Sequence, residues 1–138
     1  MKIKQIESSY IIRLEIGEEL AESLEKFVRE YDIKGGWITG LGGATKAQIG
    51  YYNLNRKKYV FRAIKDVREL VSLTGNISRI GDEVALHLHG VVTDSNNRPR
   101  GGHIKSLTVG GTCEVRIDIL PEMNRKVDPD IGLPLLDL

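Results

Sequence analysis

All three histidines of this 138-residue chain fall within one stretch, between positions 87 and 103. His87 and His89 alternate with two leucines in Leu86-His87-Leu88-His89. Side chains two positions apart in a β-strand point to the same face of a sheet. We therefore expect the two imidazoles to share a polar face, while the two leucines point into the core.

The third histidine, His103, follows a segment dense in turn-forming residues, Asp94-Ser95-Asn96-Asn97-Arg98-Pro99-Arg100. This composition predicts a loop that joins two antiparallel strands. Because the chain would reverse there, His103 would return beside His87 and His89. Three imidazoles on one patch are the usual ligands of a zinc ion that keeps a coordination position open.

A plainer interpretation of these histidines stays open. Two histidines in one strand are often solvated or hydrogen-bonded side chains with no metal. An H-x-H pair with a distant third histidine is also a weaker signal than an HExxH motif or paired CxxC motifs. The spacing alone thus indicates a metal site without establishing one.

A divalent ion on three neutral imidazoles keeps its full charge, so it lowers the pKa of a bound water or polarises a carbonyl group. Catalysis also requires a general acid or base near the metal. The candidates in the sequence are Glu69, Glu114, Asp94 and Arg100. For Glu69 the alternative is an exposed strand residue, because a lone carboxylate is more often a surface group than a catalytic one.

Length and composition predict a single domain over residues 1–138. Apolar residues make up 41% and charged residues 28% of the chain, as in globular proteins. The net charge of +1 provides no strong attraction to nucleic acid, membranes or acidic ligands. Residues 121–138 hold three of the four prolines and end in several leucines, so we expect this tail to pack on the domain or on a neighbouring subunit.

The single cysteine, Cys113, is either a fourth, soft metal ligand or a small core residue. One cysteine excludes an internal disulfide, which fits a reducing compartment. The first residues lack the apolar core of a signal peptide, and no segment approaches the roughly 20 apolar residues that span a bilayer. We therefore expect a cytoplasmic protein with no membrane partner.

The elements that must position the histidines are mostly strands. Apolar residues recur at every third or fourth position from residue 18 to about residue 31, which predicts a helix that Gly35 and Gly36 end. Alternation of apolar and polar residues, and β-branched residues, predict the other elements. These are strands at 9–16, 48–52, 59–64, 69–77 and from 87 to 120, with Val115, Ile117 and Ile119 inward, and turns at 53–58 and 79–82.

A glycine-rich run, Gly36-Trp37-Ile38-Thr39-Gly40-Leu41-Gly42-Gly43-Ala44, separates the predicted helix from the next strand. Such a run is found in phosphate-binding loops, but those loops lead into a helix. Residues 48–52 predict a strand instead. Tight packing between strands, or a bulged turn, accounts better for the glycines.

Four segments together resemble a known family, the Plants and Prokaryotes Conserved (PPC or PCC) domain, in its stand-alone prokaryotic form. They are Thr39-Gly40-Leu41-Gly42, Glu69-Leu70-Val71-Ser72-Leu73-Thr74-Gly75-Asn76, His87-Leu88-His89-Gly90 and Gly101-Gly102-His103-Ile104. The resemblance implies a compact α+β domain with a mostly antiparallel sheet and one main N-terminal helix, similar in architecture to acetolactate decarboxylase. It also implies a homotrimer with one zinc ion per chain on His87, His89 and His103, and Glu69 matches the family pattern.

Plant members of this family carry an AT-hook, a basic Arg-Gly-Arg-Pro segment that reads the minor groove of DNA. The nearest counterpart here, Arg98-Pro99-Arg100-Gly101, has similar letters in another order, and we interpret it as a turn with two solvated charges. Groove-binding proteins need a basic footprint, which a nearly neutral chain does not predict. The DNA-binding description of the family therefore transfers poorly.

These observations favour a non-catalytic, zinc-containing homotrimer that binds a small molecule or a partner, in a regulatory role. The main alternative is a zinc-dependent lyase or hydrolase that acts on a small carbonyl- or ester-bearing metabolite. A DNA-associated protein is the second alternative. The first two functions depend on the same three histidines.

Overall fold

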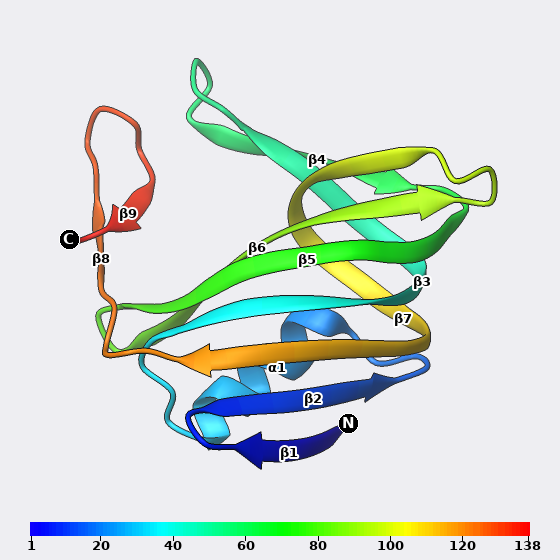
Figure 1. Ribbon diagram of the computed structural model, residues 1–138. Coiled ribbons are helices and arrows are strands. Elements are labelled where there is room, and N and C mark those ends of the chain that lie inside the picture. Colours follow the sequence, from blue (N-terminus) through cyan, green and yellow to red (C-terminus); the bar gives the residue numbers. More distant parts are fainter.

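One antiparallel sheet of seven strands makes up most of the computed structural model, which describes residues 1–138 (Figure 1). Its strand order is β1-β2-β7-β6-β5-β3-β4. The elements are β1 (Lys2–Ile6), β2 (Ser9–Glu15), α1 (Leu20–Glu30), β3 (Gly36–Asn53), β4 (Lys58–Ile64), β5 (Val67–Ile80), β6 (Glu83–Asp94), β7 (Pro99–Ile119), β8 (Arg125–Val127) and β9 (Pro134–Leu136). The predicted α+β class, with a mostly antiparallel sheet and one helix, is confirmed.

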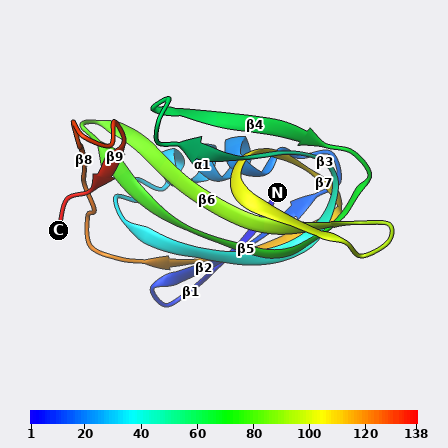
Figure 2. The same cartoon turned by 90° about the horizontal axis from the view of Figure 1, so that it is seen from above.

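The two longest strands, β3 and β7, pair with each other and close the sheet on itself. Strand β7 pairs first with β6 and then with β3, while β3 pairs with β5 and β5 pairs with β6. These four strands therefore form a ring, and their inward side chains join a core of 23 buried residues. Figure 2 shows the sheet curving around this interior, with α1 inside the curve.

Helix α1 covers the inner face of the sheet with the apolar stripe that the sequence predicts. The buried side chains of the stripe are Leu20, Leu24, Phe27 and Val28. The helix begins two residues later than predicted because Glu19 caps it: its carboxylate accepts hydrogen bonds from the backbone N–H groups of Glu22 and of Leu107 in β7. At 11 residues, α1 is too short to cross a lipid bilayer.

The glycine-rich run is the first half of β3, and β3 continues without interruption to Asn53. The prediction of a separate strand at 48–52 is therefore wrong, whereas the prediction of tight strand packing is confirmed. A Cβ atom at Gly42 or Gly43 would collide with backbone carbonyls of β7. The register shifts beside these glycines, where two steps from Gly42 to Ala44 in β3 lie opposite four steps from Cys113 to Val109 in β7. The extra residues bend β7.

The loop between β6 and β7 is shorter than predicted, because Pro99 and Arg100 already pair with Thr93 and Val92 of β6. The interpretation of two solvated charges in this loop holds for Arg100, which is exposed. It also holds for Arg98, whose side chain is 70% exposed, although its guanidinium lies 2.8 Å from a carboxylate oxygen of Asp94. Asp94 also accepts two backbone hydrogen bonds from the loop, so it fixes the reversal that brings β7 back beside β6.

The tail beyond β7 folds back as a hairpin of β8 and β9 (Figure 1). Asn124 forms a bridge with Arg79 at the end of β5, and Asn76 and Ser78 of β5 accept hydrogen bonds from Arg125. The loop between β8 and β9 is tied to the β3–β4 hairpin, because the carbonyl of Ile131 accepts a hydrogen bond from the Tyr52 hydroxyl. The tail therefore spans from the end of β5 to the end of β3.

The close approach of β3 and β7 predicts that Gly43→Ala is strongly destabilising. The added methyl group would collide with the carbonyl of Gly110, and a backbone atom cannot move aside as a side chain can. We expect a loss of about 2–3 kcal/mol in the free energy of unfolding, measured by urea denaturation.

Gly101→Ala is the matched control, because its methyl group would lie 3.1 Å from a backbone oxygen and 3.2 Å from a methyl group of Val91. Small shifts relieve these contacts, so the loss should stay below about 1 kcal/mol. Equal stability of the two variants would contradict the importance of this approach.

Candidate metal centre

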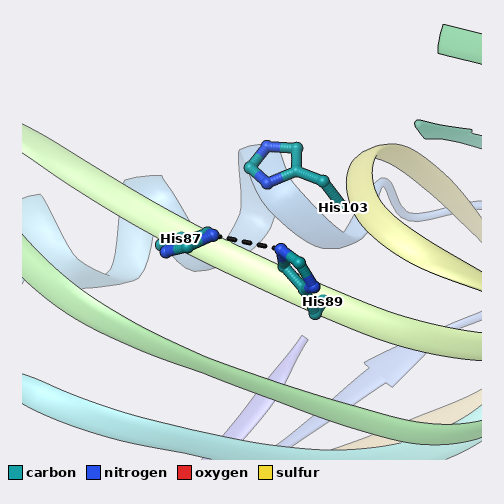
Figure 3. Close-up of side chains that lie close together, drawn as sticks. All are labelled: His87, His89 and His103. Carbon is teal, nitrogen blue, oxygen red and sulfur yellow. Dashed lines mark hydrogen bonds between the residues drawn. The ribbon is translucent and has the colours of Figure 1, made fainter. Parts of the chain in front are cut away.

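The structure brings His87 and His89 of β6 together with His103 of β7 (Figure 3). His103 lies directly opposite His89 in the register of the two strands. The ring centroids of the three imidazoles are 4.9–5.4 Å apart, and one nitrogen of each ring lies within 4.8 Å of the others. The Nε2 atoms of His87 and His89 are 3.1 Å apart. We call these three residues the histidine triad.

The alternation of β6 places the triad on the outer face of the ring. Leu88, between the two histidines, is buried in the core, as the sequence predicts. Just before His103, Gly102 has a φ of +153°, and a Cβ atom there would lie 2.6 Å from the carbonyl of Gly50. The glycine is needed because β7 passes this close to β3 where it delivers the third imidazole.

Two aromatic side chains of β4 pack against His103. The ring of Tyr59 lies 4.5 Å and that of Phe61 lies 6.0 Å from the imidazole, centroid to centroid. These contacts shield part of the imidazole from water. They also fix the orientation of the ring, which a metal ligand requires.

Burial and mutual repulsion favour the neutral form of two of the three imidazoles, those of His87 and His103. Burial, followed by the charges of His87 and His89, lowers the pKa of His103 to about 4. Burial, then the charges of His89 and Arg125, also lowers the pKa of His87. Because only a neutral imidazole has a free lone pair for a metal, both shifts favour the ligating form at neutral pH.

The geometry of the triad suits a divalent ion. A tetrahedral zinc ion with Zn–N bonds of about 2.0–2.1 Å places its nitrogen ligands about 3.3 Å apart. The separation of 3.1 Å between the Nε2 atoms of His87 and His89 is close to this value. In addition, the buried Nδ1 atom of His103 has no hydrogen-bond partner, so the protein leaves this polar atom unsatisfied.

None of the carboxylates named as general acids or bases joins the triad. Glu69 lies opposite Thr93, which is four residues or about 13 Å along β6 from His89. Asp94 is occupied by Arg98 and by the loop backbone. Glu114 is an exposed residue opposite Leu41. Strand register sets the positions of these carboxylates, so the residue types alone could not show that they lie away from the triad.

Arg100 and Cys113 also lie away from the triad. Arg100 pairs with Val92, and its side chain is exposed. Cys113 is fully buried between Leu14 of β2 and Gly42 of β3, and burial raises the pKa of its thiol to about 11. A protonated thiol in the core fits the small-core-residue interpretation and not a fourth ligand.

A cavity of about 270 Å³ lies beside the triad, and His87 and His103 form part of its wall. The wall also includes two polar residues that the sequence did not single out, Tyr59 and Arg125. The remaining lining is apolar and consists of Ile80, Ala85, Leu86 and the tail residues Leu133, Pro134 and Leu135. No spacing in the sequence links Arg125 to the histidines, because the tail reaches them only through the fold.

A family model described as the Plants and Prokaryotes Conserved (PCC) domain matches residues 1–121. A crystal structure from Bacteroides thetaiotaomicron, provisionally described as a DNA-binding protein, is 30% identical with a TM-score of 0.94, covering 99% of this chain and 96% of that one. A metal-containing protein from Archaeoglobus fulgidus is 30% identical with a TM-score of 0.85, covering 100% of both chains.

The α-acetolactate decarboxylase of Bacillus subtilis strain 168 is 20% identical with a TM-score of 0.57, covering 93% of this chain and 60% of that one. This likeness shows a shared fold and confirms the predicted similarity in architecture. The bifunctional protein GlmU of Synechococcus sp. (strain JA-3-3Ab) is 27% identical over 127 residues, which are 89% of this chain and 19% of GlmU. The chain thus spans about a fifth of the length of this curated relative.

The lowered pKa of His103 predicts that metal-free protein loses stability in acid. The folded state takes up this proton only near pH 4, whereas the unfolded chain takes it up near pH 6.5. Between these values the unfolded state holds more protons, so the free energy of unfolding falls as the pH falls. We expect a loss of about 1–2 kcal/mol, allowing for solvent screening of a half-exposed ring.

Urea denaturation of chelator-treated protein at about pH 7 and about pH 4.5 measures this loss. Carboxylates such as Asp94 also lose stabilising interactions in acid, because hydrogen bonds lower the pKa of Asp94 in the folded state. His103→Asn is the control, since it removes the histidine contribution and keeps the carboxylate one. An identical pH profile in the two proteins would contradict the prediction.

Proposed function

The chain belongs to the Plants and Prokaryotes Conserved domain family, and from this premise we propose that it binds one zinc ion through His87, His89 and His103. The observation that carries the proposal is the meeting of three imidazoles, with ring nitrogens within 4.8 Å of one another. The unsatisfied Nδ1 of His103 supports it, as does the metal content of the Archaeoglobus fulgidus relative. When bound, zinc supplies a Lewis acid with an open coordination position.

The proposed role is the binding of a small molecule or partner at this metal, in regulation. No carboxylate lies at the triad to act as a general acid or base, and this favours binding over turnover. One observation favours the alternative of a zinc-dependent lyase or hydrolase for small carbonyl or ester metabolites. Tyr59 lines the cavity, and burial raises the pKa of its phenol, which keeps it a proton donor.

DNA association is a weaker proposal, although two similar structures, from Bacteroides thetaiotaomicron and Ralstonia eutropha, are provisionally described as DNA-binding. The net charge is +1, and the three consecutive basic residues Arg56, Lys57 and Lys58 lie at an exposed hairpin tip. Such a small footprint gives weak binding to phosphates at physiological salt. A cytoplasmic location is also proposed, because a single cysteine allows no internal disulfide, which fits a reducing compartment.

We further propose that the outer face of the sheet makes the protein a homotrimer. Trp37 and Leu41 of β3 are 45% and 56% exposed, and Ile11 of β2 is 37% exposed. The register places them in adjacent rows on one face of the sheet, the face that also carries the histidine triad. Large apolar side chains that are exposed together on one face are characteristic of an interface between subunits.

The metal proposal predicts that purified protein loaded with zinc retains about one ion per chain after dialysis. His87→Ala and His103→Ala should each lower zinc affinity by more than about 100-fold, because two remaining imidazoles bind the ion weakly. Metal analysis and competition with a chromogenic chelator measure the two quantities. Glu69→Gln is the control and should retain the ion. Wild-type protein without zinc, or alanine variants that keep it, would refute the site.

The assembly proposal predicts a mass by light scattering of about three times the 15.4 kDa of one chain. Trp37→Glu should yield a monomer, because three copies of a charge cannot be buried at an apolar interface. Lys26→Glu, on the exposed side of α1, should leave the mass unchanged. A wild-type monomer would exclude the trimer, and a trimeric Trp37→Glu protein would exclude this face.

A further inference from the structure

Arg125 is a half-buried cation without a counter-ion. Its Nε donates a hydrogen bond of 2.7 Å to the hydroxyl of Ser78, and its Nη2 donates one of 2.7 Å to the side-chain oxygen of Asn76. Its Nη1 donates a third, of 2.8 Å, to the carbonyl of Pro134. All three acceptors are neutral, and none of the ion pairs in the structure includes Arg125.

The fold holds this cation in place from three sides. Asn76 and Ser78 are 7% and 0% exposed, so the two acceptors from β5 are buried, and Pro134 belongs to β9. A guanidinium has five N–H groups, which leaves one N–H on each terminal nitrogen for a ligand. Partial burial of a positive charge costs free energy unless an anion compensates it.

The unpaired charge lies on the cavity beside the histidine triad. Arg125, His87 and His103 all line this cavity. The opening is closed in part by the tail, which adds the apolar side chains of Leu133 and Leu135. The cavity therefore combines a fixed cation, a candidate metal position and an apolar wall.

We infer that this cavity binds a small carboxylic acid with a second oxygen donor, such as a 2-oxo or 2-hydroxy acid, and that Arg125 pairs with its carboxylate. The second oxygen would face the histidine triad, and this part of the inference rests on the proposed metal site. A planar carboxylate matches the geometry of a guanidinium, which binds it through two N–H groups. The volume of about 270 Å³ limits the ligand to a short chain, since one water occupies about 30 Å³.

Binding of three matched probes by isothermal titration tests the inference. We expect zinc-loaded protein to bind 2-oxobutyrate more tightly than butyrate, which lacks the second oxygen, or 1-hydroxy-2-butanone, which lacks the carboxylate. Arg125→Gln should weaken 2-oxobutyrate binding by about tenfold or more, because it removes a charged hydrogen-bond donor. Arg100→Gln, at an exposed site outside this cavity, should bind all probes as the wild type does.

A metal-free arm separates this inference from the proposed function. Without zinc, wild-type protein should still bind butyrate more tightly than Arg125→Gln does. This result does not depend on whether the proposed zinc site is correct. Arg125→Lys, which keeps the charge, provides a second variant, and thermal unfolding shows whether each variant is folded. Equal carboxylate binding by wild-type and folded Arg125→Gln protein would overturn the inference. Tighter binding of inorganic phosphate than of any carboxylate probe would overturn the ligand class.

Discussion

The pairing of β3 with β7 along almost their whole length is the constraint on which the rest of this structure depends. It closes the sheet into a ring, and it requires glycines where the two backbones approach most closely, at Gly42 and Gly43. The bend in β7 that allows this pairing also directs its first residues to β6. The pairing of the later part of β7 with β3 therefore helps to place His103, near the start of β7, opposite His89 of β6.

Much of the local structure could be predicted from the sequence because its cause is local. The apolar stripe of α1 follows a helical period, and the alternation around His87 follows the period of a strand. The continuity of β3 could not be predicted, because glycines lower the strand propensity of a segment and only a partner strand reveals why they are there. That partner is β7, which pairs with both β6 and β3, and the local sequence pattern of β3 does not reveal it.

The candidate site likewise has a part that could be predicted from the sequence and a part that could not. The H-x-H spacing and the turn-forming loop were enough to predict that three imidazoles converge, since one reversal of the chain is the only long-range event involved. Glu69 is equally suitable by residue type, but register places it opposite Thr93, four residues along β6 from His89. Tyr59 and Arg125 reach the cavity through two further hairpins, and no spacing in the sequence encodes that meeting.

The charges of the site indicate which ligands it can hold. Three neutral imidazoles would leave the proposed zinc ion with its full charge, and Arg125 adds a further positive charge to the same cavity. The nearby residues supply no carboxylate to offset these charges. An anionic ligand would therefore complete the electrostatics of the site, whereas a catalytic carboxylate would have to come from outside the triad and its cavity. The tail lines one side of the same cavity with Leu133, Pro134 and Leu135, so an anion bound there would also contact an apolar wall.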